Sequence, residues 1–149
     1  MKIEQVIKTQ RISSLELKAT ITLFYTNNWL LEKHQILFKK QGLTSQQYNV
    51  LRILRGQFPN PAKVSLIKER MLDKMSDTSR IIDRLEKNNW VKRNVNLADK
   101  RSVDVVITNQ GLLKLIELDS YLPEMDAMVN NLTHEELNQL TDLLDKLRG

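Results

Sequence analysis

The sequence predicts a mostly α-helical protein with a small antiparallel β-hairpin, and three observations support this fold class. Apolar residues recur every three, four or seven positions over most of the chain, which is the spacing of amphipathic helices. Residues 90–95 and 102–107 instead alternate with a period of two, which is typical of strands. The chain has 149 residues and no cysteine, so it is long enough to bury a hydrophobic core without disulfides.

The first long helix is expected from Leu15 to Gln41, after a polar lead-in over residues 1–13. Two apolar stripes with a seven-residue repeat run along one side of it: Leu17, Phe24, Leu31 and Phe38, and beside them Leu23, Leu30 and Leu37. Gly42 follows at the position where glycine commonly ends a helix. One domain of this size has little need for so long an apolar face, so we expect part of it to pack on another subunit.

Two shorter helices are expected next. Thr44–Gln47 has the Thr-x-x-Gln pattern of a capping box, which starts a helix whose apolar edge is Tyr48, Leu51 and Leu54. Two prolines in residues 59–61 end that helix. A short helix is then expected from about residue 65 to residue 72.

Residues 68–108 have the outline of a winged helix-turn-helix: two short helices about a tight turn, then two strands joined by a basic loop. The second of these helices, called the reader helix below, is expected to begin with Ser76 as its N-cap. Its inner face carries Ile81, Ile82 and Leu85, and we expect Met71, Leu72 and Met75 to meet that face from the preceding turn. The outer face is polar and mostly cationic, and it carries Ser76, Ser79, Arg80, Asp83, Arg84 and Lys87.

The strand pair and the charge pattern point to a polyanionic partner. Residues 96–101 are too many for a two-residue turn and end in cations, so they should project as a wing, while Val103, Val105 and Ile107 share one face of the second strand. Residues 1–62 carry a net charge of +6, residues 63–101 carry +5, and residues 102–149 carry −6. A basic front with an acidic tail suits a nucleic-acid binder that has a separate assembly segment.

The C-terminal third is expected to form helices for assembly. After Thr108, a predicted helix cap, a broad apolar surface runs through Leu112, Leu113, Leu115, Ile116, Leu118 and Leu122. Pro123 falls inside this pattern and either kinks the helix or divides it. Residues 133–136 form a second capping box, and Leu137, Leu140, Leu143, Leu144 and Leu147 line the last helix. These helices lack an intrachain partner of equal size, which predicts a symmetric dimer interface.

The segment from Asp99 to Gly111 resembles the wing signature of the multiple-antibiotic-resistance-regulator (MarR) family of bacterial transcription factors. Asp99-Lys100-Arg101 matches Asp-x-Arg, Val105-Val106-Ile107-Thr108 matches the strand end, and Gly111 follows three residues on. Residues 89–93 are similar to the family's Gly-aromatic-Val-x-Arg segment, with Asn89 where glycine is usual. The resemblance covers nearly the whole chain. It implies one domain over 1–149, a winged helix-turn-helix core at 44–108 and dimerisation helices at 15–42 and 109–148.

Together, the basic stripe and the resemblance predict a sequence-specific transcriptional regulator, most simply a homodimeric repressor on pseudo-palindromic double-stranded DNA. We expect Ser76, Thr78, Ser79 and Arg80 to read bases, and Lys74, Arg84, Lys87, Lys92 and Arg93 to meet phosphates. The resemblance implies that Arg101 reaches the minor groove or its phosphates from the wing, and we expect Lys100 to serve the wing beside it. It also implies that Asp99 keeps the wing's shape by pairing with an arginine.

The resemblance further implies a small aromatic acid as effector, for which Tyr25, Trp29 and Tyr48 are candidate ligand residues, although aromatic residues at helical spacing are more often core. His34 and His134 each stand alone, so we expect no metal, and no catalytic motif indicates an enzyme or a cofactor. No apolar run approaches the roughly 18 residues of a membrane span, and the N-terminus lacks a signal peptide's apolar core, so a cytoplasmic protein is expected. Two alternatives are a winged-helix protein-interaction module and a small-molecule-binding protein without direct DNA regulation.

Overall fold

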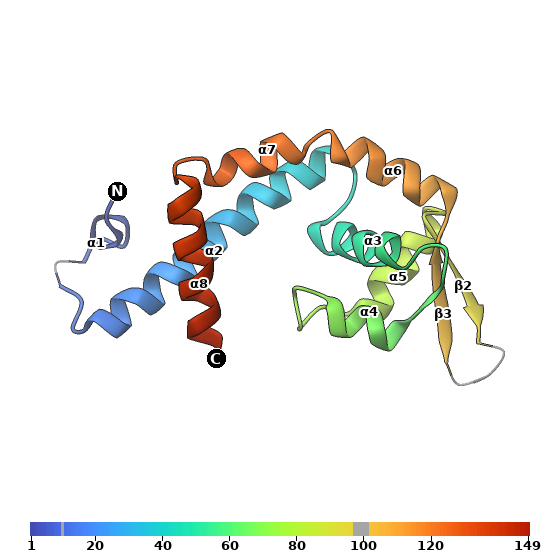
Figure 1. Cartoon of the computed structure of the whole chain (residues 1–149), viewed down its shortest axis with the longest axis horizontal. Helices are drawn as coiled ribbons and strands as arrows, with labels where there is room; N and C mark the ends of the chain where they lie inside the picture. The colour runs from blue at the N-terminus through green and yellow to red at the C-terminus, as the bar shows by residue number, and fades with distance from the viewer. Residues whose placement is uncertain (10, 97–101) are drawn as a thin grey trace. The chain divides into compact units, whose positions relative to one another are not determined.

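Helices make up most of the chain, as the apolar periodicity predicts (Figure 1). The computed structural model describes residues 1–9, 11–96 and 102–149, and the chain divides into two units, residues 1–37 and 38–149. The first unit holds α1 (Ile3–Val6) and most of α2 (Leu15–Lys40). Gly42 follows α2 with a φ of +74°, the left-handed backbone that glycine adopts without steric cost.

The second unit contains the winged helix-turn-helix, so the predicted fold class is confirmed. Its elements are, in order, α3 (Ser45–Gln57), β1 (Ala62–Lys63), α4 (Val64–Arg70), α5 (Thr78–Lys87), β2 (Val91–Val95), β3 (Val103–Ile107), α6 (Asn109–Asp119), α7 (Leu122–Asp126), the 3-10 helix η1 (Ala127–Val129) and α8 (His134–Arg148). The reader helix of the sequence analysis is α5. The two-residue strand β1 was not predicted, because a strand this short leaves no alternation to detect.

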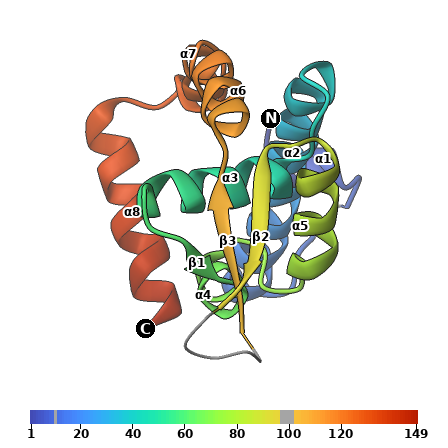
Figure 2. The same ribbon diagram turned by 90° about the vertical axis from the view of Figure 1, so that its right-hand side faces the viewer.

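The three strands form one antiparallel sheet in the order β1-β3-β2 (Figure 2). Val105 and Ile107 are buried on its inner face, as their period-two spacing predicts. Val103 shares that face by the same alternation but is 38% exposed. β1 pairs only with residues 104 and 105 of β3, whereas Val103 pairs with the exposed Val95 beyond the end of β1. The sheet is therefore two-stranded where the wing begins.

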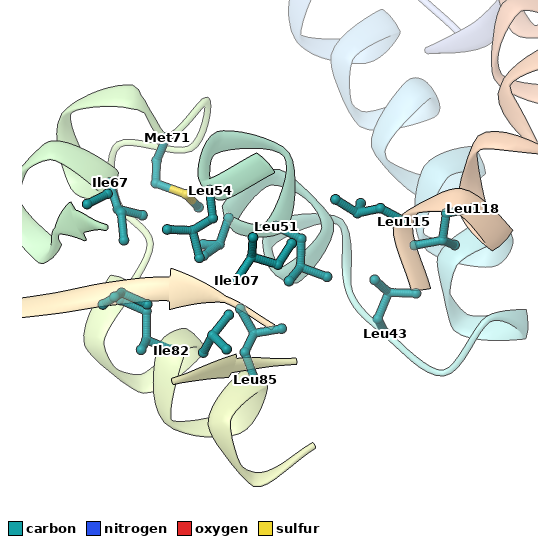
Figure 3. Close-up of a cluster of buried hydrophobic side chains, with 14 of the residues drawn as sticks. Leu43, Leu51, Leu54, Ile67, Met71, Ile82, Leu85, Ile107, Leu115 and Leu118 are labelled. Carbon is teal, nitrogen blue, oxygen red and sulfur yellow. The ribbon is translucent and has the colours of Figure 1, made fainter. Parts of the chain in front are cut away.

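The hydrophobic core of the second unit packs the reader helix against α3 and the sheet (Figure 3). Ile82 and Leu85 of α5 are completely buried, and they meet Leu51 and Leu54 of α3 in the same cluster. Burying one such side chain contributes about 1.5–3 kcal/mol. The inner face of the reader helix is thus held by packing, which leaves its outer face for contacts with other molecules.

Side-chain caps begin several helices at the predicted residues. Thr44 Oγ1 accepts the Gln47 backbone N–H at 3.1 Å, and Gln47 Oε1 accepts the Thr44 N–H at 2.8 Å. Thr133 and Glu136 repeat this reciprocal pair at 3.2 and 2.8 Å. Both capping boxes are therefore confirmed. Each satisfies two backbone donors that a helix start leaves unpaired.

One helix boundary differs from its prediction, and another decides between two predicted alternatives. The reader helix begins two residues after Ser76, and Asp77 is its N-cap, accepting the Arg80 N–H at 3.1 Å. The prediction that Ser76 caps it is wrong, because the Ser76 hydroxyl donates to the Asp73 carbonyl at 2.7 Å. Pro123 divides the C-terminal helices: it occupies the first turn of α7, where its missing N–H breaks no hydrogen bond.

The turn between α4 and α5 corrects a prediction about core residues. Met71 is buried, as expected, but Leu72 is 87% and Met75 93% exposed. The chain leaves the helical conformation at Met71, with φ −60° and ψ 136°, and this extended residue turns the following side chains away from the core. Leu72 and Met75 therefore do not meet the inner face of the reader helix.

Candidate nucleic-acid interface

The outer face of the reader helix is cationic and open. Ser79, Arg80, Arg84 and Lys87 are all exposed there, at the intervals of three and four that the helical period predicts. The buried Ile82 and Leu85 on the opposite face prevent the helix from rotating. The backbone therefore fixes the directions in which these polar side chains leave the helix.

The turn that leads into the reader helix is held by local hydrogen bonds. Asp73 Oδ1 accepts the Met75 N–H at 3.0 Å, and the Asp73 carbonyl accepts the Ser76 N–H at 3.2 Å. Asn49 of α3 accepts the Leu72 N–H at 2.9 Å, which ties the turn to the helix beneath it. The Lys74 ammonium donates to the Glu69 carbonyl at the end of α4. Lys74, predicted to meet phosphate, is exposed and also helps to close this turn.

Thr78 occupies a different position from the other predicted base readers. It is 4% exposed, and its hydroxyl has no hydrogen-bond partner among the described residues. Thr78 lies four residues before Ile82 and seven before Leu85, so the helical period places it on the inner face. The spacing in the sequence could therefore have predicted that Thr78 is buried. Ser76, by contrast, is half-buried, and Ser79 and Arg80 are exposed.

Arg93 of β2, expected to meet a phosphate, is held by two carboxylates of the reader helix. Its Nη2 lies 2.6 Å from Asp83 Oδ1 and 2.8 Å from Glu86 Oε2, and its Nε donates to the same Glu86 oxygen at 2.9 Å. The Arg93 backbone N–H donates to Glu86 Oε1 at 3.0 Å. These hydrogen bonds lower the pKa of Glu86 and raise the pKa of Arg93. The cluster fastens the wing's first strand to the reader helix.

Sequence reasoning did not single out Glu86. Asp83 and Glu86 are three residues apart and thus on one side of a helix that precedes a strand with an arginine, which is the signal that could have identified the cluster.

Among the described residues, a side-chain and a backbone hydrogen bond join the two strands at the base of the wing. Asn96 Nδ2 donates to Asp104 Oδ2 at 2.8 Å, and the Asn96 N–H donates to the Ser102 carbonyl at 3.0 Å. Lys92 on β2 is exposed, as a phosphate contact would require. The predicted wing residues Asp99, Lys100 and Arg101 lie outside the described residues.

The far end of the reader helix is joined to α6 by a close backbone contact. Asn89 closes the helix with a φ of +57°, and its carbonyl accepts the Thr108 hydroxyl at 2.6 Å. Thr108 Oγ1 in turn accepts the Gly111 N–H at 3.1 Å, which confirms Thr108 as the cap of α6. A Cβ atom on Gly111 would lie 2.2 Å from the Trp90 carbonyl oxygen. Only glycine permits this approach.

A second connection links α3 to the last residue of α6. Arg55 Nη1 and Nη2 donate to the two Asp119 carboxylate oxygens at 2.7 and 3.3 Å. This hydrogen-bonded pair raises the pKa of Arg55. The geometry is bidentate, which fixes orientation as well as distance.

A hollow of about 250 Å³ lies beside the start of the reader helix. It is lined by Thr44, Gln46, Asp73, Ser76, Asp77, Arg80, Ile81 and Arg84. Two arginines and two carboxylates give it a polar, mixed-charge wall. The predicted ligand residues Tyr25, Trp29 and Tyr48 are not among those that line it.

The three aromatic candidates belong to different units of the chain. Tyr25 is 46% exposed and Trp29 is half-buried, both on the part of α2 within residues 1–37. Tyr48 of α3 packs its ring against Phe38, with ring centroids 4.7 Å apart. Its hydroxyl accepts a hydrogen bond from Arg52 Nη1 at 2.9 Å.

The described part of the chain lacks two other features, a metal-binding cluster and a membrane-spanning helix. No three His, Asp or Glu side chains gather there in an arrangement that could hold a metal ion. No described helix combines the length and the hydropathy that a membrane crossing requires.

Comparison with known proteins supports the interpretation of this surface. Residues 43–103 match the model of the MarR family. The chain is 36% identical to the HTH-type transcriptional repressor MdtR of Bacillus subtilis (strain 168) over 110 residues, which cover 73% of this chain and 70% of MdtR.

Two solved structures share the fold. A mutant of the Escherichia coli MarR protein, complexed with operator DNA, has a TM-score of 0.75 at 22% identity and covers 99% of both chains. The organohalide-sensing regulator RdhR, in its 2,4-dichlorophenol-bound form, has a TM-score of 0.80 at 18% identity and covers 91% of this chain and 80% of that one. Both matches extend beyond the winged core to the flanking helices.

Proposed function

The chain belongs to the MarR family of DNA-binding transcriptional regulators, which are not enzymes, and from this premise we propose that it is a cytoplasmic homodimeric repressor of a pseudo-palindromic operator. The observation that carries the proposal is the outer face of α5. Exposed Ser79 and Arg80 follow a hydrogen-bonded turn at the start of a helix whose inner face is buried. In helix-turn-helix proteins this end of the helix contacts base edges in the major groove.

The residues of this surface divide by their expected contacts. We assign base reading to Ser76, Ser79 and Arg80, since an arginine pairs well with guanine O6 and N7. The exposed cations that we assign to phosphates are Lys74, Arg84, Lys87 and Lys92. The wing residues Lys100 and Arg101 remain proposed minor-groove contacts, with Asp99 as their support.

Two residues take revised roles in the proposal. Thr78 is buried, so we assign it to the support of the reader helix. Arg93 is engaged by Asp83 and Glu86, so we assign it to positioning the wing strand.

A homodimer is supported by apolar side chains that the flanking helices leave exposed. They are Leu15, Leu17, Leu23, Phe24, Leu31 and Ile36 on α2, Leu113 and Ile116 on α6, and Leu140, Leu143 and Leu147 on α8. None of the residues of α8 is buried. Pairing these faces about a two-fold axis would set two reader helices about one DNA turn, roughly 34 Å, apart. We therefore keep residues 15–42 and 109–148 as the proposed dimerisation segments and residues 44–108 as the proposed DNA-binding core.

The proposal also includes a small aromatic effector that controls DNA binding. RdhR binds 2,4-dichlorophenol. In this chain the Arg52 guanidinium lies 5.7 Å from the centroid of the Tyr48 ring. An aromatic acid of similar size would suit such a pair of an aromatic ring and a cation. We propose that a small aromatic acid relieves repression, with Tyr25, Trp29 and Tyr48 as candidate contacts. A thermal-shift screen with aromatic acids tests it: the expected binder raises the unfolding temperature and weakens DNA binding. If the screen finds no such compound, only the proposal of an aromatic effector fails.

Footprinting the purified protein across the DNA upstream of its own gene tests the central proposal. The expected result is one protected inverted repeat, bound by a protein that sediments as a dimer. Affinity should fall by roughly 10³–10⁵ between about 50 and 200 mM salt if about 6–10 phosphates are contacted. A protein-interaction module would leave all upstream DNA unprotected at low salt.

A further inference from the structure

Met75 stands out among the apolar side chains of the winged helix-turn-helix. It is 93% exposed, and among the large hydrophobic residues of the described chain only Met1, at 99%, is more exposed. Most of the other exposed apolar side chains lie on the proposed dimer helices α2, α6 and α8. Met75 lies instead three residues before the first residue of the reader helix.

Hydrogen bonds hold the backbone of the turn that carries this side chain. Asp73 accepts hydrogen bonds from the N–H groups of Met75 and Ser76, at 3.0 and 3.2 Å, and from the Ser76 hydroxyl at 2.7 Å. The Ser76 carbonyl accepts the Thr78 N–H at 3.0 Å. The turn is thus closed on both sides of Met75. A backbone that is already held in place loses less entropy when its residues bind than a loose loop does.

The surroundings of Met75 are those of the proposed DNA surface. Lys74 and Ser76 flank it in the sequence, and the exposed Ser79 and Arg80 follow in the first turn of the helix. Cations beside the turn would draw it toward the phosphates, and the start of the helix would bring it to the base edges. The inference below rests on the proposed function, since it names what this apolar group meets there.

The major groove offers one apolar group to such a side chain, the C5-methyl of thymine. We propose that Met75 is a specificity-determining residue that packs its thioether chain against the C5-methyl of one thymine in each half-site. Methionine suits this contact, because its unbranched side chain adapts to the shape it meets. The contact discriminates against cytosine, which lacks the methyl group, and it leaves hydrogen-bonding readout to Arg80 and Ser79.

Single thymine-to-deoxyuridine replacements test the contact, because they remove the methyl group and keep base pairing. On the footprinted operator, the wild-type Kd should rise roughly fourfold per half-site at one thymine, the factor that one buried methyl group is worth. Met75→Gln should raise the Kd on the thymine operator by a similar factor. It should also bind the thymine and deoxyuridine operators equally well.

Leu72→Gln is the matched control. Leu72 is 87% exposed on the same turn, but it directly follows the extended residue that ends α4 and lies six residues before the reader helix. This variant should keep the wild-type response to deoxyuridine. Both exposed substitutions should leave the unfolding midpoint unchanged, which excludes misfolding as the cause of any loss.

The outcomes separate the contact from the function on which it rests. A wild-type protein that protects its operator but responds to no deoxyuridine would overturn the contact and leave the repressor proposal standing. The contact also fails if Met75→Gln keeps the response, or if Leu72→Gln abolishes it as well. Absence of any salt-sensitive DNA binding would overturn the proposed function and the contact together.

Discussion

The reader helix α5 has two charged sides that differ in what they contact. On the outer face, Arg80 and Arg84 extend into solvent. On the side toward β2, Asp83 and Glu86 hold Arg93 at 2.6–2.9 Å. The first side presents arginines to solvent, whereas the two carboxylates of the second side balance the positive charge of Arg93 on β2.

This difference separates the residues that would bind DNA from those that position the helix that binds it. Contacts of the second kind extend to the junction of Asn89, Thr108 and Gly111, which joins the reader helix to α6. Substitutions at these contacts, which attach the reader helix to β2 and α6, should change the free energy of unfolding. Substitutions on the outer face should change DNA affinity at constant stability.

The largest effect on stability is expected at Gly111, one of the residues that attach the reader helix to α6. Gly111→Ala would place a Cβ atom 2.2 Å from the Trp90 carbonyl oxygen and 2.7 Å from Ile107 Cγ1. The first neighbour is backbone, which cannot rotate away, so we expect a loss of about 3 kcal/mol or more in the free energy of unfolding. Urea denaturation followed by circular dichroism measures it.

Gly56→Ala provides the matched control for that substitution. Gly56 lies within α3, and a Cβ atom there would meet nothing within 4 Å. Alanine in a helix is more stable than glycine by about 0.5–1 kcal/mol, so this variant should be as stable as the wild type or more stable. Equal losses at both glycines would show that the Trp90 contact is not the cause.

Arg80→Ala should have the next largest effect, on binding alone. The side chain is exposed, and Asp77 caps the helix through the Arg80 backbone N–H, which alanine retains. We expect a loss of about 1–3 kcal/mol in binding free energy and weaker base preference at one position per half-site. Fluorescence anisotropy on a panel of operator variants measures both. If preference stays sharp at every position, Arg80 is not a reader.

The Glu86–Arg93 pair should contribute less, and its contribution should depend on pH. Arg93 holds the pKa of Glu86 below its ordinary value of about 4.3. The stabilisation is therefore fully present above about pH 4.3 and is lost as the pH falls through the lowered pKa. Because both side chains are about one-third exposed, we expect Glu86→Gln to cost only about 0.5–1 kcal/mol at neutral pH.

Chemical unfolding of the wild type and the Glu86→Gln variant at pH 7 and near pH 3.5 checks this expectation. The difference between the two proteins should shrink on acidification. A difference that stays constant would mean that the carboxylate charge is not what stabilises the attachment. Arg93→Lys keeps the charge but cannot make the Nε and Nη2 contacts with Glu86 together, so this variant should lie between the two.

Helical periodicity explains why much of the reader helix could be predicted. The buried Ile82 and Leu85, and the exposed Arg80, Arg84 and Lys87, lie where a period of 3.6 residues places them. The capping boxes were predictable because their reciprocal hydrogen bonds join residues only three apart in the chain. Local rules suffice where the partners are local.

The environment of other residues depends on contacts that helical periodicity does not reveal. Arg93 pairs with carboxylates on another element, and charge alone does not distinguish such an arginine from one that meets DNA. Leu72 and Met75 are exposed because the chain becomes extended at Met71, which an apolar pattern does not reveal. The Ser76 hydroxyl bonds the Asp73 carbonyl within the turn, so Asp77 is left to cap the helix.

The smallest predicted effect concerns Lys87 at the end of the reader helix, and it refines the distinction within the outer face itself. Lys87 is exposed in the last turn, far along the helix from Arg80, so we expect it to meet a phosphate and no base. Lys87→Ala should weaken binding about equally for all operator variants and lower the slope of log Kd against log salt by about 1 per half-site. Titrations at four salt concentrations measure that slope. A change in base preference without a change in slope would place Lys87 among the readers instead, and the outer face would then read bases along its whole length.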